Sequence, residues 1–115
     1  MEKLIFRRGD IITCALSGDY GKPRPAILIQ SDLFNETHAS ITVCPLTTHL
    51  VESPLFRLSV VPSPENGLKK PSQIMADKIS TIKASRAKSL LGVLNQTQME
   101  NLNRAIALWL DLDLA

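Results

Sequence analysis

The fold of this chain is most constrained by a series of short apolar runs that are separated by clusters of turn-forming residues. Most runs are continuously apolar, as in buried strands, and one alternates apolar and polar side chains, as in a half-exposed antiparallel strand. Strands are expected at 11–16, 25–30, 41–46, 55–60, 74–75, 79–82 and 88–94. Many short strands at this spacing favour a mainly β fold, a small β-barrel, over a parallel α/β sheet.

The last fifth of the chain predicts one amphipathic helix. The run TQME (97–100) fits a capping box, in which the threonine oxygen and the glutamate side chain satisfy free backbone N–H groups at the start of a helix. Apolar side chains then recur at three- and four-residue spacing, at Met99, Leu102, Ile106 and Trp109. We expect this stripe to pack on the sheet or on a partner subunit.

Length and composition predict one domain that spans residues 1–115 and buries a core without disulfide or metal staples. No apolar run reaches the length of a membrane span, about eighteen residues, and the first residues lack the features of a secretory signal. A cytoplasmic location is therefore expected. Cys14 and Cys44 lie inside apolar, strand-like runs instead of in C-x-x-C spacing, which predicts buried, reduced thiols.

Charge is distributed unevenly along the chain. The net charge of +2 is too small for a dedicated duplex-DNA binder, which needs clustered Lys and Arg to neutralise phosphates. Basic residues nevertheless gather in one stretch in which Glu65 and Asp77 are the nearby acids; they are Lys69, Lys70, Lys78, Lys83, Arg86 and Lys88. Such a run fits a basic binding face and equally an ordinary solvated surface.

Familiar catalytic motifs are missing from the sequence. There is no G-x-S-x-G elbow, Walker loop, zinc-type His/Cys cluster or Rossmann glycine pattern after a strand. His38 and His49 are the side chains that titrate near neutral pH, and a lone loop histidine is more often a surface residue than a catalyst. These observations argue against unaided hydrolase and nucleotide-cofactor chemistry.

Four polar residues adjoin or interrupt the apolar runs: Arg24, Thr47, Thr48 and Asp77. Arg24 stands between two prolines, which stiffen its backbone and hold the guanidinium near a loop end, where it suits a phosphate. Thr47 and Thr48 directly follow an apolar run, which places their hydroxyls at a strand end. Asp77 lies beside Lys78 between two β-segments, where a turn residue or a surface ion pair is the plainer interpretation.

These residues lie in a set of runs that resembles the MazF/PemK family of toxins. In chain order the runs are RGDI (8–11), GKPRPAILIQ (21–30), VCPLTT (43–48), NGLKKPSQIM (66–75) and ADKI (76–79). The arginine–proline strand is the more specific of them, and the ordered set with the terminal helix covers nearly the whole chain. The resemblance implies a small SH3-like β-barrel of the CcdB/MazF/PemK type with a C-terminal α-helix.

The resemblance also implies an activity. Toxins of this family are metal-independent endoribonucleases that cleave single-stranded RNA, such as messenger RNA, at short sequences and thereby inhibit translation and growth. The ribose 2′-hydroxyl attacks the adjacent phosphate and leaves a 2′,3′-cyclic phosphate and a 5′-hydroxyl, and no cofactor is implied. These toxins act as homodimers with the active groove at the two-fold interface. A MazE-like antitoxin, encoded nearby, is expected to occupy that groove with an acidic C-terminal segment.

The resemblance assigns roles to particular residues. Arg24 corresponds to the catalytic arginine that holds and polarises the scissile phosphate, and Thr47 to a hydroxyl residue that orients it. Asp77 is a second-rank assignment, as a proton acceptor or as an organiser of Arg24. RNA contacts are assigned to Tyr20, Lys22, Thr48, His49, Lys78 and Arg86. The loop at 17–22 is expected to close over RNA, with Tyr20 stacking on a base.

The sequence departs from some relatives in its proton-transfer groups. Met75 stands where those relatives carry an arginine that acts as general acid, and the loop at 17–22 lacks the histidine that others use. His49 and Arg86 are the candidates to replace them. Two alternatives to the nuclease stay open: a CcdB-like gyrase poison, although Trp109 lies within a helix and not in a tail, and an SH3-like barrel that binds RNA or a peptide without cleaving it.

Overall fold

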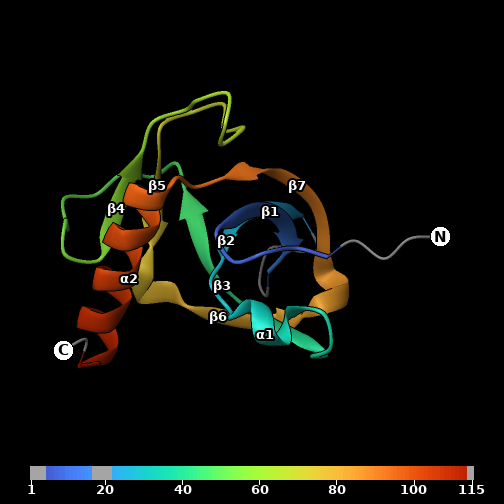
Figure 1. Cartoon of the computed structure of the whole chain (residues 1–115). Coiled ribbons are helices and arrows are strands. Elements are labelled where there is room, and N and C mark those ends of the chain that lie inside the picture. Colours follow the sequence, from blue (N-terminus) through green and yellow to red (C-terminus); the bar gives the residue numbers. More distant parts are fainter. Residues whose placement is uncertain (1–4, 17–21, 114–115) are drawn as a thin grey trace.

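The computed structural model describes residues 5–16 and 22–113, which form an antiparallel sheet and several helices (Figure 1). The strands are β1 (Asp10–Ala15), β2 (Pro23–Leu28), β3 (Ser40–Thr47), β4 (Arg57–Val60), β5 (Ser72–Met75), β6 (Ser80–Lys83) and β7 (Ala87–Val93). The helices are α1 (Asp32–Asn35), α2 (Gln96–Leu110) and two 3₁₀ turns, η1 (Ala76–Lys78) and η2 (Ala84–Arg86).

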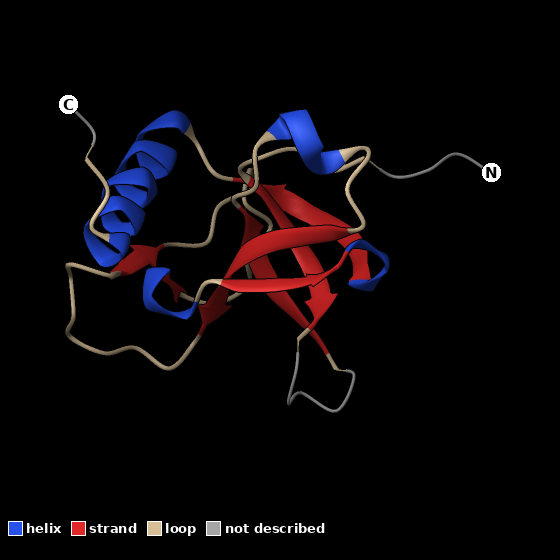
Figure 2. Cartoon of the chain, turned by 90° about the horizontal axis from the view of Figure 1, so that it is seen from below, coloured by secondary structure: helices blue, strands red, loops and turns tan. Residues whose placement is uncertain are grey.

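The seven strands have the order β4-β5-β3-β2-β1-β7, and β6 pairs with β3 outside this path. Every pairing is antiparallel. Figure 1 shows β1, β2 and β7 curling round on one side of the molecule, while β4 and β5 lie beside α2 on the other. Figure 2 shows the same arrangement from below, with most of the sheet on one side and the long C-terminal helix on the other. The predicted mainly β, barrel-like fold with a C-terminal helix is confirmed.

The central strands β1, β2 and β3 are covered on both faces, which explains why their sequences are continuously apolar. One face belongs to a core cluster that contains Ile11, Ile27 and Cys44 and is completed by Leu102 and Ala105 of α2. The other face belongs to a second cluster, in which the neighbouring residues of the same strands meet Ile82 of β6: Ile12, Cys14, Ala26, Leu28 and Val43. The two cysteines are buried as predicted.

Arg8 of the RGDI run ties three parts of the fold together. Its backbone N–H donates to Asp32 Oδ1 at 2.7 Å, its Nε donates to the carbonyl of Ile29 at 2.8 Å, and its Nη2 donates to Asn103 Oδ1 at 2.6 Å. Gly9 follows at φ +96, a conformation that residues with a Cβ rarely adopt, and turns the chain into β1. This run is therefore part of the scaffold, linking β1 to α1 and α2.

Helix α2 begins two residues earlier than predicted. The cap is Asn95, whose Oδ1 accepts from Gln98 N–H at 2.8 Å, while Gln98 Oε1 accepts from Asn95 N–H at 2.9 Å. The TQME box is therefore not used. Leu94, before this cap, is buried, and Met99 packs against the same core cluster, as in a hydrophobic staple. A hydrophobic staple joins the residue before the cap to the residue four positions after the cap. With Thr97 as the cap both of these residues are polar, which is why the structure favours Asn95.

Helix α1 differs from the sequence prediction. It is capped by Ser31 and lies in the polar stretch between β2 and β3, where no element was predicted. Trp109, in the stripe of α2 that was expected to pack on the sheet or on a partner subunit, is 49% exposed, with its ring 5.4 Å from that of Phe56. In the described part of the chain, no helix has both the length and the apolar character needed to cross a membrane.

Candidate active site

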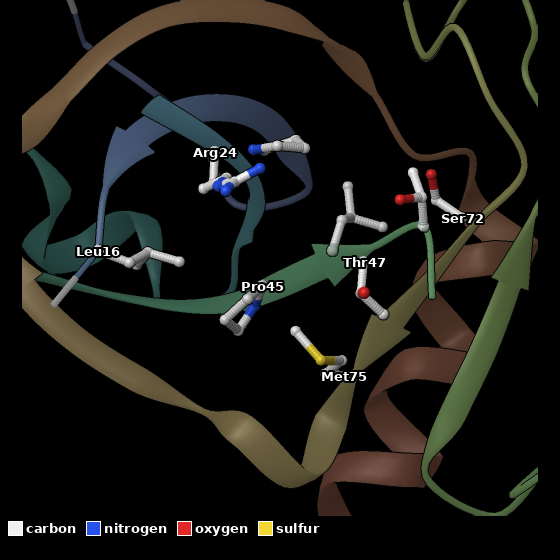
Figure 3. Close-up of a pocket in the computed structure, with 9 residues that line it drawn as sticks. Leu16, Arg24, Pro45, Thr47, Ser72 and Met75 are labelled. Atoms are coloured by element: carbon white, nitrogen blue, oxygen red, sulfur yellow. The ribbon is translucent and has the colours of Figure 1, made fainter. Parts of the chain in front are cut away.

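A cavity of about 360 Å³ opens where β2, β3 and β5 come together. Its volume falls in the range typical of ligand sites in proteins, roughly 300 to 1,000 Å³. Figure 3 shows the labelled side chains around the shared space: Arg24 from β2, Pro45 and Thr47 from β3, Ser72 and Met75 from β5, and Leu16 from the end of β1. Pro25, Leu46 and Thr48 complete the lining. The structure thus brings Arg24, Thr47 and Thr48 to one cavity.

Sheet register explains why Arg24 and Thr47 share this cavity. In the antiparallel pair of β2 and β3, Ala26 lies opposite Pro45 and Leu28 lies opposite Val43. The same register, continued by two residues beyond Ala26 and Pro45, brings Arg24 opposite Thr47. Because side chains alternate along a strand, both residues lie on the sheet face that carries Ala26 and Pro45. Arg24 is exposed and Thr47 half-buried, so a solute reaches both.

The hydroxyl of Thr47 is fixed by the backbone that follows it. Its Oγ1 accepts a hydrogen bond from the backbone N–H of His49 at 3.0 Å. Since this bond uses a lone pair and not the hydroxyl proton, the Thr47 O–H can still donate to a ligand oxygen. The cavity therefore combines a guanidinium with an oriented hydroxyl donor, a pair suited to an anion such as a phosphodiester.

A second cavity, of about 550 Å³, adjoins the first. Leu16, Pro45 and Met75 belong to both linings, so the two cavities form one groove that continues toward β6. Lys78, Ser80, Thr81 and Ile82 line the second part. Lys78 is exposed and brings a second positive charge to the groove, next to apolar walls that suit a flat ring.

Asp77 forms an ion pair with Arg57 of β4. Arg57 Nε donates to Asp77 Oδ1 at 2.8 Å, and Arg57 Nη2 donates to Oδ2 at 3.2 Å. The side chains are 13% and 9% exposed, respectively. The hydrogen bonds from Arg57 lower the pKa of Asp77, against a smaller opposing effect of burial. Both carboxylate oxygens of Asp77 are therefore engaged by Arg57, and neither cavity is lined by Asp77.

Residues 7–110 match the family described as PemK-like, MazF-like toxin of type II toxin-antitoxin system. The chain belongs to this family. A curated relative, "Probable endoribonuclease MazF" of Mycolicibacterium smegmatis, is 43% identical over 108 residues, which cover 93% of this chain and 98% of that protein.

Solved structures of MazF toxins have the same fold. "Mycobacterium tuberculosis toxin MazF-mt6" superposes with a TM-score of 0.78 at 27% identity and covers 90% of this chain and 98% of that one. "Endoribonuclease in complex with its cognate antitoxin from Mycobacterial species" has a TM-score of 0.78 at 23% identity, covers 98% and 100% of the two chains, and supports the fold alone. The predicted family and SH3-like fold are confirmed.

The remaining predicted site residues of this MazF-like toxin are less closely grouped. Lys22 is exposed and directly precedes β2, and exposed His49 follows Thr48 without lining either cavity. Arg86 ends η2, beside a separate cavity whose walls include Ala84, Ser85 and Ala87. Tyr20 lies outside the described residues, so the predicted stacking on a base stays a prediction.

The structure adds residues that sequence reasoning missed. Ser72 lines the first cavity, and its hydroxyl donates to the carbonyl of Lys70 at 2.9 Å. Arg57 was missed because its partner, twenty residues away, becomes a neighbour only when β4 pairs with β5. Met75 was noted as a departure from relatives, and it does lie in the cavity wall. Within the described residues, no cluster of His, Cys, Asp and Glu is placed to hold a metal ion.

Proposed function

We propose that this toxin is a metal-independent endoribonuclease that cleaves single-stranded RNA in the groove beside Arg24 and Thr47. The ribose 2′-hydroxyl attacks the adjacent phosphorus, the bond to the 5′-oxygen of the next nucleotide breaks, and a 2′,3′-cyclic phosphate and a 5′-hydroxyl result. The supporting observation is the shared cavity, in which a guanidinium and an oriented hydroxyl face one small volume. The relative at 43% identity, named as an endoribonuclease, supports the same activity.

Arg24 supplies the positive charge that this reaction needs. Negative charge grows on the equatorial oxygens as phosphorus becomes five-coordinate, and a guanidinium binds two such oxygens with its planar donors. The prolines on either side of Arg24 restrict its backbone, and the pairing of β2 with β1 places Arg24 opposite Cys14. The charge is therefore in place before the reaction begins.

Thr47 and Thr48 orient the phosphodiester. The Thr47 hydroxyl accepts a hydrogen bond from His49 N–H, which fixes its position. It donates a hydrogen bond to a phosphate oxygen that Arg24 does not bind. A hydroxyl has too high a pKa to serve easily as a base, so its part is positioning and charge stabilisation. Thr48 adds a second hydroxyl to the same wall.

Asp77 acts through the scaffold and not as the proton acceptor. A carboxylate whose pKa is lowered by Arg57 is a weak base, and binding a proton disrupts its two hydrogen bonds. Within the described residues, the first cavity is lined by no carboxylate or imidazole. Electrostatic stabilisation and positioning by Arg24 and Thr47 therefore carry most of the rate enhancement.

The RNA strand runs along the groove formed by the two cavities. Lys22 lies beside Arg24 in sequence and Lys78 lines the second cavity, so backbone phosphates on either side of the scissile bond meet positive charge. Tyr20 stacks on a base, and His49 and Arg86 extend the contact surface. A homodimer combines two sets of these residues, which compensates for a net charge of only +2 per chain.

A MazE-like antitoxin inhibits the toxin by covering this groove. An acidic segment that binds at Arg24, Lys22 and Lys78 excludes the phosphates that need the same residues. The similar mycobacterial fold that was solved with its cognate antitoxin supports a partner of this kind. Inhibition is therefore expected to be competitive with RNA.

The test is cleavage of single-stranded RNA by purified toxin in the presence of EDTA, with the product ends mapped. We expect 2′,3′-cyclic phosphate and 5′-hydroxyl ends, loss of cleavage in Arg24→Ala, and retained cleavage in Lys69→Ala, a control that removes an exposed cation outside both cavities. RNA binding without cleavage supports the non-catalytic barrel instead. A parallel incubation with gyrase and DNA tests the gyrase-poison alternative, and DNA cleavage there contradicts the proposal.

A further inference from the structure

Gln73 in β5 is almost completely buried, with 6% exposed. Its side-chain amide forms two hydrogen bonds with the backbone of a single residue, Val51. Its Oε1 accepts from the N–H of Val51 at 3.0 Å, and its Nε2 donates to the carbonyl of Val51 at 2.8 Å. The amide thus takes the place that a neighbouring peptide group has in a sheet. Because a buried amide is costly unless its bonds are made, this contact fixes the position of Val51.

This contact holds the segment that leaves β3 just after Thr47. Gln73 lies opposite Thr47 in the pairing of β3 with β5, and Val51 follows Thr47 by four positions. At the near end of the same segment, the N–H of His49 donates to Thr47 Oγ1. The segment is therefore fastened at both ends, and Thr48, which lines the active cavity, lies between them.

The backbone of Gln73 pairs with that of Thr47, but its side chain does not line the groove. Together with Val51, Glu52, Ser53 and Arg57, it lines a different cavity, and it lines neither part of the groove. Ser72 and Met75 of the same strand line the active cavity, whereas Gln73 does not. Any effect of Gln73 on cleavage must therefore pass through the backbone that it holds.

We propose that Gln73 is a positioning residue for the cleavage reaction: its amide holds the segment after β3 so that the hydroxyls of Thr47 and Thr48 face Arg24. This inference rests on the proposed function. When the amide is removed, the N–H and carbonyl of Val51 lose their partners, the segment gains freedom, and the hydroxyls spend less time in the productive arrangement. Arg24, held by β2, still binds RNA.

The first test replaces Gln73 by Met, which keeps the volume and removes both hydrogen bonds. Single-turnover cleavage at saturating RNA is expected to fall about tenfold or more, because misplacing a reacting group by a small distance costs that much or more in rate. The RNA concentration for half-maximal rate is expected to stay within about threefold, since Arg24 and the lysines are unchanged. Backbone amides from Thr48 to Val51 are expected to exchange hydrogen faster than in the wild type.

The second test replaces Gln73 by Glu and follows cleavage against pH. A protonated carboxyl has an O–H donor and a carbonyl acceptor, so it restores both bonds to Val51, whereas the ionised form loses the donor. Burial raises the pKa of the introduced carboxyl above its ordinary value of about 4.3. The cleavage rate of Gln73→Glu relative to wild type is therefore expected to rise as the pH falls through the raised pKa of the introduced carboxyl.

Ala105→Gly in α2 is the matched control, because it lowers stability through the helix without touching the segment after β3. The positioning role is overturned if Gln73→Met cleaves RNA at the wild-type rate, or if Ala105→Gly loses as much cleavage rate as Gln73→Met. In either case, cleavage by the wild type and its loss in Arg24→Ala still support the nuclease. If Gln73→Met does not fold, the pH series decides: a cleavage rate of Gln73→Glu relative to wild type that does not change with pH overturns the positioning role. A wild type that does not cleave RNA overturns both proposals.

Discussion

Arg24 and Thr47 line one cavity from neighbouring antiparallel strands, and each lies two residues beyond Ala26 and Pro45, which are paired in the register of β2 on β3. Neither residue is carried by a long loop, so the distance between their backbones is as well defined as the sheet itself. A site built on strands holds reacting groups more precisely than one built on loops. The hydroxyl and the guanidinium are thereby held in place to bind one anion together.

The role of the Thr47 hydroxyl predicts different outcomes for two conservative substitutions. Thr47→Val keeps the shape but removes the O–H donor and the acceptor for His49 N–H, and we expect single-turnover cleavage to fall by about 10²-fold. Thr47→Ser keeps both functions and is expected to retain cleavage within about tenfold. Equal rates for Thr47→Val and wild type, measured on the same RNA, contradict this role.

The Arg57–Asp77 pair predicts a pH-dependent contribution to stability. Because the folded-state pKa of Asp77 lies below its ordinary value of 3.8, the pair stabilises the protein above that value, and the contribution is lost as pH falls through the lowered pKa. Asp77→Asn is therefore expected to lower the free energy of unfolding by about 1–3 kcal/mol at pH 7. The difference from wild type should shrink as the pH falls from about 4 toward 2.

Urea denaturation of wild type, Asp77→Asn and Glu65→Gln across this pH range measures the effect. Glu65→Gln removes a carboxylate from an exposed position and serves as the control for the change in net charge. A difference between wild type and Asp77→Asn that is the same at pH 7 and at low pH shows that Arg57 does not stabilise the ionised form.

The cap of α2 gives a direct comparison between two neighbouring residues. Asn95→Ala removes the Oδ1 that accepts from Gln98 N–H and is expected to cost about 1 kcal/mol of unfolding free energy. Thr97→Ala, at an exposed position inside the first turn, is expected to change it by less than about 0.5 kcal/mol. Thermal unfolding of both variants measures the change in unfolding free energy. If Thr97→Ala loses more stability than Asn95→Ala, the cap is Thr97, as the sequence alone suggested.

The sequence predicted the strands well where burial on both faces leaves a continuous apolar run. β2 and β3 are such strands, and their apolar residues divide between the two core clusters. It predicted less well where a short polar segment decides the structure. Helix α1 has four residues and one side-chain cap, at Ser31, which is too little signal to distinguish it from a turn. Two overlapping cap patterns, at 95–98 and 97–100, were separated only by the packing of Leu94 and Met99.

The candidate site was partly predictable for a similar reason. Arg24 and Thr47 lie in runs with a recognisable order, so the resemblance located them, and the sheet brings them together. Asp77 belongs to such a run as well, but its partner Arg57 lies in a strand that carries no motif. Gln73 and Ser72 look like ordinary strand residues in the sequence. Their importance appears only when β5 is placed beside β3.

The central claim, that Arg24 and Thr47 act on one phosphodiester, is tested most directly by a double-mutant cycle. Single-turnover RNA cleavage is measured for wild type, Arg24→Ala, Thr47→Val and the double variant, after circular dichroism has shown that each is folded. We predict a loss of about 10²–10³-fold in Arg24→Ala. The double variant should be little slower than Arg24→Ala, because groups that act as a unit are strongly non-additive. Losses that simply multiply, or an Arg24→Ala variant as active as wild type, contradict the account.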